Sequence, residues 1–186
     1  PPFRGGSIDQ IFSLVEELMK FEPPFIDLTS RSAEEYYQDD GSGNLVQHIR
    51  RKRPGTIGIS AAIKNKFNVE TVPHLLCSGF SKEETEDALI ELNYLGIKND
   101  LALRGDDLRK DRNEINSKIS NGYASDLVKQ IKNMNEGKYL EPLIDPTKSD
   151  FCVGVSGYPE KHFEAIDFKT DIKYLKEKVE NGADYI

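Results

Sequence analysis

Short apolar runs alternate along the chain with longer stretches in which apolar residues recur every three or four positions. The first such stretch follows Ser7, whose spacing to Gln10 is that of a capping box, and it predicts a helix over residues 8–21. A second capping box, Ser81 with Glu84, and a closing Gly96 delimit a helix between them. Further helices are predicted over residues 45–53, 57–67, 125–135 and 171–181.

Apolar runs bounded by proline, glycine or polar clusters predict short buried strands between these helices. They cover residues 25–29, 72–77, 100–104 and 152–158, and the run 183–186 resembles the start of another strand. Such alternation is typical of a parallel sheet covered by helices, so we expect an α/β fold. A doubly wound sheet and a (β/α)8 barrel share this pattern, and periodicity alone leaves both open.

Length and charge narrow the class of protein. The 186 residues suit one domain, whereas a complete barrel of this kind needs about 250 residues. Twenty-five basic against 32 acidic residues give a net charge of -7, which argues against nucleic-acid or anionic-membrane partners. Cys77 and Cys152 fit no zinc or redox spacing, and no apolar stretch approaches the ~20 residues that span a membrane. We therefore expect a cytoplasmic protein without a metal.

Polar residues at the carboxyl ends of the predicted strands are the candidates for chemistry, because ligands of parallel α/β folds bind there. In Arg104-Gly105-Asp106 the glycine allows close backbone approach to a ligand, although a turn with a local ion pair has the same sequence. A lone His74 in an apolar strand is more typical of a hydrogen-bonded core residue. The loop 158–165 is denser in polar groups than a simple connection needs.

Two further groups of polar residues have an ordinary structural explanation. Ser125 and Asp126 suit the beginning of a helix, which leaves Tyr123 and Ala124 unexplained. Asp171 and Lys178 lie seven residues apart on one helix face and, as a lone pair, are typical of solvated surface charges.

Five ordered segments nevertheless resemble methylenetetrahydrofolate reductases. They are Val-Pro-His-Leu-Leu-Cys at 72–77, Leu-Ala-Leu-Arg-Gly-Asp at 101–106, Tyr-Ala-Ser-Asp-Leu-Val at 123–128, Tyr-Pro-Glu-Lys-His-Phe-Glu-Ala at 158–165, and 175–184. The resemblance implies a (β/α)8 TIM barrel, incomplete in this stretch, with non-covalent FAD at the strand carboxyl ends. It also implies that NADH or NADPH reduces the flavin, which then converts methylenetetrahydrofolate to 5-methyltetrahydrofolate.

The resemblance assigns roles to individual positions. Asp106 is implied as the catalytic residue that also binds the pterin edge of folate, whose N–H donors suit a carboxylate. Lys178 and Asp171 are implied to reach the phosphate and ribose region of FAD. The implied FAD contacts are Thr29, His74, Arg104, Gly105, Asp106, Ala124, Tyr158, His162, Glu164, Ala165, Asp171 and Lys178.

The sequence departs from the family pattern in several places. Segments of about 31–56 and 137–149 are insertions, the first expected to extend or double the following helix, and Glu177 stands where a basic residue is common. The family's general-acid Glu belongs just upstream of Pro1, and its folate-contacting Gln just beyond Ile186. We therefore expect residues 1–186 alone to be catalytically incomplete, and the full-length protein to be a homo-oligomer.

Two other functions remain open from the sequence. One is another flavin-dependent barrel oxidoreductase, such as a protein of the proline-dehydrogenase type. The other is a non-catalytic flavin- or folate-binding module of a larger assembly. Flavin absorbance together with NADH oxidation separates an enzyme from a binding module.

Overall fold

The computed structural model describes residues 5–30, 34–50, 55–105 and 119–186, and Asp106 lies outside these ranges. Five helices alternate with strands: α1 (Ile8–Met19), α2 (Thr56–Phe67), α3 (Lys82–Tyr94), α4 (Ala124–Asn135) and α5 (Phe168–Glu180). The strands are β1 (Phe25–Leu28), β4 (Glu70–Leu76), β5 (Asn99–Leu103) and β6 (Cys152–Val155), together with the hairpin β2 (Glu34–Asp39) and β3 (Leu45–Arg50). In the described ranges no helix combines the length and apolar character needed to cross a membrane.

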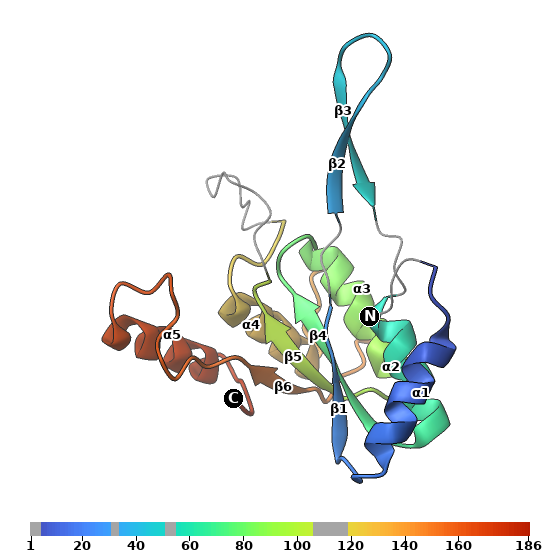
Figure 1. The fold of residues 1–186 in the computed structure, drawn as a ribbon. Coiled ribbons are helices and arrows are strands. Elements are labelled where there is room, and N and C mark those ends of the chain that lie inside the picture. The colour runs from blue at the N-terminus through green and yellow to red at the C-terminus, as the bar shows by residue number, and fades with distance from the viewer. Residues whose placement is uncertain (1–4, 31–33, 51–54, 106–118) are drawn as a thin grey trace.

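The sheet is parallel throughout, in the order β1-β4-β5-β6 (Figure 1). Tyr185 adds a parallel bridge to Gly154, which places the segment after α5 beside β6. The expected parallel α/β arrangement and the strand start at 183–186 are thus confirmed. In the described part of the chain, β1 and the Tyr185 segment form the two edges of the sheet, so its closure into a barrel stays a prediction.

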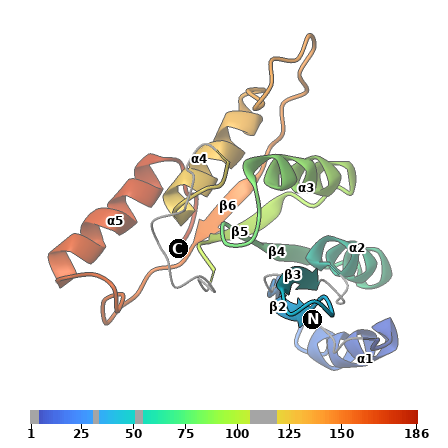
Figure 2. The same ribbon diagram turned by 90° about the horizontal axis from the view of Figure 1, so that it is seen from above.

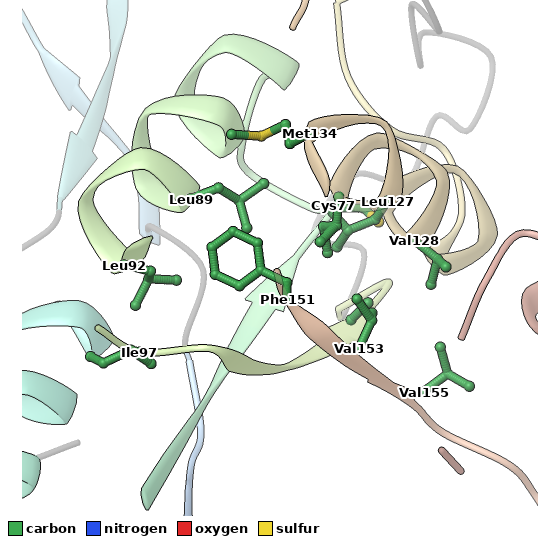
Figure 3. Close-up of a cluster of buried hydrophobic side chains, with 12 residues drawn as sticks. Cys77, Leu89, Leu92, Ile97, Leu127, Val128, Met134, Phe151, Val153 and Val155 are labelled. Carbon is green, nitrogen blue, oxygen red and sulfur yellow. The ribbon is translucent and has the colours of Figure 1, made fainter. Parts of the chain in front are cut away.

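One face of the sheet packs against α3 and α4 and forms the main core (Figures 2 and 3). Ala102, Val153 and Val155 supply the strand side of this core, and Leu89 and Leu127 are among its helix residues, all at most 1% exposed. Side chains alternate across a strand, so the intervening residues project from the opposite face. Paired positions of parallel strands share a face, which puts His74, Leu101 and Gly154 together on that opposite face.

The helix predicted over residues 45–53 is wrong, because residues 45–50 form strand β3, which pairs antiparallel with β2. The turn explains the difference: Asp39 accepts hydrogen bonds from the Gly41 and Gly43 N–H groups, and both glycines have positive φ, near 87°. Only glycine adopts this conformation readily, so the chain reverses here. In its described residues, the segment expected to be an insertion is therefore a hairpin rather than a lengthened helix, and it rises from the carboxyl end of β1 (Figure 1).

Other boundaries shift by a few residues. Helix α5 begins at Phe168 rather than Asp171, because the Asp167 side chain accepts the Thr170 N–H and caps the helix. Strand β6 ends at Val155, which leaves 156–158 in the following loop. The second insertion lies in the connection from α4 to β6, where the Glu86 carboxylate accepts the Leu140 N–H at 2.8 Å.

We expect Gly154→Val to destabilise the fold. A Cβ at this position would lie 2.2 Å from Cζ of Tyr185, whose ring covers the glycine and whose hydroxyl donates to the Asp100 carbonyl at 3.2 Å. The ring must move away, and overpacking of this kind costs about 1–3 kcal/mol in the free energy of unfolding. Urea titration measures the change.

Gly58→Ala is the matched control, since no atom lies within 4 Å of the added Cβ in α2. It should leave stability unchanged or raise it by about 0.5–1 kcal/mol. If Gly154→Val were as stable as the wild type, the Tyr185 ring could not lie over Gly154.

Candidate functional site at the carboxyl ends of the strands

The loop after β6 is joined to the end of β5 by an ion pair. Arg104 Nη1 lies 2.6 Å from Glu164 Oε2, and the two side chains are 25% and 24% exposed. The Arg104 guanidinium also lies over the Tyr123 ring, 5.5 Å from its centroid, within the range of a cation–π contact. Three segments far apart in sequence therefore meet at one place. The resemblance implied Arg104 and Glu164 as FAD contacts, and the ion pair that joins them was not predicted.

The loop 158–165 is folded on itself around His162. Its imidazole lies edge-on to the Tyr158 ring and is stacked on Phe163. The backbone N–H of Glu164 donates to His162 Nδ1 at 3.2 Å. The backbone N–H of His162 donates to Asp171 Oδ2, also at 3.2 Å. The loop thus presents a fixed imidazole and ties itself to α5.

Lys178 projects from α5 toward the end of β6 rather than into solvent. Its Nζ donates to the Ser156 carbonyl at 2.9 Å. Burial lowers the pKa of Lys178, and the Asp171 carboxylate acts in the opposite direction. The interpretation of Lys178 as a solvated surface charge is therefore wrong: the ammonium is held beside the same loop as His162.

His74 occupies the face of the sheet opposite the helices, on the strand beside β1. Its side chain is 14% exposed, and Nε2 lies 3.8 Å from Oδ1 of Asp27. Burial lowers the pKa of His74, against an opposing influence of Asp27. Within the described ranges Nε2 is buried without a hydrogen-bond partner, so a fully hydrogen-bonded core histidine does not describe this residue.

The remaining candidates are spread along the same edge. Gly105 has φ 82°, and a Cβ there would lie 3.3 Å from Ser78 Cβ, so glycine keeps the backbone close to the loop after β4. Thr29 follows β1 and is exposed, whereas Ala124 and Ala165 are each 6% exposed. Cys77 belongs to the core, where burial raises the pKa of its thiol to about 12. Asp106 directly follows Gly105 in sequence and lies outside the described residues.

Sequence reasoning missed two residues of this region. Asp27 was passed over because it stands inside a short apolar strand, yet an acidic residue at an alternate strand position is itself a signal. Lys161 was not singled out either. It has φ 78°, and its ammonium donates to the His162 carbonyl at 3.1 Å, which folds the loop back on itself.

Known proteins with a similar sequence share one description. Residues 1–186 match the family model for methylenetetrahydrofolate reductase. The chain is 31% identical to methylenetetrahydrofolate reductase 1 of Schizosaccharomyces pombe over 187 residues, covering 100% of this chain and 26% of that protein. It is 38% identical to the 5,10-methylenetetrahydrofolate reductase of Buchnera aphidicola subsp. Baizongia pistaciae over 185 residues, 98% of this chain and 50% of that protein.

A rice relative, named a probable methylenetetrahydrofolate reductase (NADH), is 30% identical over 197 residues, which include 100% of this chain and 28% of that protein. The chain thus spans between about a quarter and a half of the length of these relatives. The match to the family model runs through the β4, β5 and β6 ends and the loops that form the site. The chain belongs to the methylenetetrahydrofolate reductase family.

Proposed function

We propose that this chain forms the flavin- and folate-binding part of a methylenetetrahydrofolate reductase. The reaction is the FAD-dependent reduction of 5,10-methylenetetrahydrofolate to 5-methyltetrahydrofolate, with NADH or NADPH as electron donor. The observation that carries the proposal is the meeting of Arg104, Glu164, His162 and Lys178 at the carboxyl ends of β5 and β6. These are the strand ends at which barrel enzymes bind their ligands.

The residues present fit the chemical groups of FAD. A diphosphate needs cations. Among the described residues Lys178 Nζ donates one hydrogen bond, to the Ser156 carbonyl, so its ammonium can also donate to a phosphate oxygen. Ribose hydroxyls need acceptors such as Asp171, and flat rings need apolar and aromatic walls such as Tyr158. The His74 imidazole has unused hydrogen-bonding capacity for a ligand, since its buried Nε2 has no hydrogen-bond partner among the described residues.

Bound FAD supplies the hydride chemistry, and the residues of this chain bind it, orient it and exclude water. The Arg104–Glu164 pair fixes the loop 158–165 over the end of β5 and so closes one side of the site. Asp106 is proposed to accept the pterin N–H donors of folate. The proton that opens the five-membered ring of the substrate is proposed to come from a glutamate of the whole protein outside residues 1–186.

The proposal is tested on the whole protein. We expect it to purify yellow, to oxidise NADH or NADPH with an artificial acceptor, and to form 5-methyltetrahydrofolate from methylenetetrahydrofolate. Flavin without turnover of either nucleotide would favour a non-catalytic flavin module. Nucleotide oxidation without folate reduction would favour a different flavin-dependent oxidoreductase.

Lys178→Ala in the whole protein should weaken FAD binding. A hydrogen bond to a charged group contributes about 1.5–3 kcal/mol, which corresponds to a rise in the FAD dissociation constant of roughly 10- to 150-fold. Flavin fluorescence on dilution measures the release.

Lys176→Ala is the control on the same helix, since Lys176 is 72% exposed and pairs with Glu180 one turn on. Its loss should not change flavin retention. Equal FAD affinity in Lys178→Ala and wild type would return Lys178 to a purely structural contact with Ser156.

A further inference from the structure

Asp27 and His74 form a polar pair on the face of the sheet that lies opposite the helices. Asp27 pairs in register with Val72, two positions before His74 on β4, and alternation puts all three side chains on one face. The Asp27 carboxylate is 50% exposed, whereas the His74 imidazole is 14% exposed. One partner is therefore half-exposed and the other is largely buried.

A buried imidazole nitrogen ordinarily has a hydrogen-bond partner, and His74 Nε2 has none among the described residues. Oδ1 of Asp27, at 3.8 Å, is within ion-pair distance but beyond a hydrogen bond. A carboxylate at this distance still favours a proton on the nitrogen that faces it. It thereby influences which of the two ring nitrogens donates and which accepts.

Among the described residues, Asp27 is the charged group that acts on His74. Tyr185, from the segment beside β6, is the other titratable group placed near Asp27, and burial raises the pKa of its hydroxyl to about 12, with Asp27 contributing. It is therefore neutral at physiological pH. Glu70, at the opposite end of β4, is held by Lys64 at 2.6 Å and by Asn99.

We propose that Asp27 is a positioning residue that sets the protonation and tautomer of His74 and thereby its hydrogen bond to the flavin. This inference rests on the proposed function for its ligand, and on the described geometry for the pair itself. With the Nε2 proton turned toward Asp27, Nδ1 is an acceptor, and loss of the carboxylate removes that preference. An outer carboxylate that orients a ligand-binding histidine is a recurrent device in protein sites.

The test is Asp27→Asn in the whole protein, a change that preserves size at a half-exposed position. Nitrogen-15 NMR of labelled histidines, assigned with His74→Gln, reports the pKa and tautomer of His74 in flavin-free protein. We expect the pKa of His74 to fall, because a favourable negative charge is removed. We also expect the Nε2–H tautomer to lose population and FAD to bind several-fold more weakly. Glu70→Gln, which removes a charge at the other end of β4, should change neither property.

An unchanged His74 pKa and tautomer in Asp27→Asn would overturn the inference. A shifted His74 with unaltered FAD affinity would also overturn it, since the pair would then not act on the flavin. Failure of the proposed function is a separate result, because protein that binds no FAD at all still gives the histidine titration. In that case the positioning role toward flavin is rejected together with the function.

Discussion

Replacing Asp106 by alanine should abolish folate reduction while sparing the oxidation of NADH by the flavin. The expectation rests on the place of Asp106 directly after Gly105 in the sequence, and on the family resemblance of this segment. Without the carboxylate, the pterin N–H groups lose water on binding and gain no acceptor, which costs about 1–3 kcal/mol for each group. Asp106 is proposed to lie near the flavin, and removing its negative charge would then favour the anionic reduced form, so nucleotide oxidation should survive.

Both half-reactions of the whole protein are measured with FAD fully bound. NADH oxidation is followed with an artificial acceptor, and methylenetetrahydrofolate reduction by the reoxidation of reduced flavin or by product. Asp107→Ala, the adjacent acidic residue without an assigned role, is the control and should keep both activities. A proportional loss of both half-reactions in Asp106→Ala, or intact folate reduction, would show that Asp106 is only a turn residue.

Replacing Asp100 by valine should stabilise the protein. Asp100 is 0% exposed, and both carboxylate oxygens are buried without a hydrogen-bond partner among the described residues. Burial raises its pKa well above 3.8, with nearby Lys132 opposing the rise and Asp184 adding to it. A buried polar group without a partner costs about 1–3 kcal/mol, and a valine side chain at this position would instead join the apolar layer beside Ala102.

The gain should depend on pH. A carboxyl group whose pKa is raised on folding stays protonated to a higher pH in the native state than in the unfolded state. The resulting loss in the free energy of unfolding is absent below pH 3.8 and complete above the raised pKa. The difference in free energy of unfolding between Asp100→Val and wild type should therefore grow from acidic to neutral pH. Urea titrations at several pH values measure it. Asp100→Asn should remove the pH dependence with a smaller gain, whereas destabilisation by valine would mean that Asp100 is an ionised partner of Lys132.

The elements with local signals could be predicted from the sequence. Ser81 and Glu84 form the capping box that their spacing indicates, and Gly96 has the positive φ expected after a helix. The strands at β4, β5 and β6 were found because each is an apolar run flanked by polar residues. The hairpin was not found, because Val46 and Ile49 fit a short helical repeat as well as a strand. Only its pairing with the polar residues 34–39 decides between them.

The site could be predicted only in part, because its side-chain contacts join residues that are far apart in sequence. Arg104, Glu164 and Lys178 were expected from the resemblance, but the contact that joins Arg104 to Glu164 spans 60 positions and has no local signature. The backbone contact of Lys178 and the approach of Asp27 to His74 likewise depend on how neighbouring strands and helices pack. Sequence spacing can place residues at one end of a sheet. The partner of each side chain follows from tertiary packing.

The hairpin between β1 and α2 also bears on how the chain folds. It forms a separate two-stranded sheet and shares no strand with the parallel sheet. The connection between the paired strands β1 and β4 is therefore longer by the length of the hairpin. The entropic cost of closing a loop rises only with the logarithm of its length, so each doubling of the length adds about 0.6 kcal/mol. The hairpin therefore adds little to the entropic cost of pairing β1 with β4, and the stability of the finished sheet is almost indifferent to it. The rim at the end of β1 is thus a place where the chain can gain or lose length without altering the sheet beneath it.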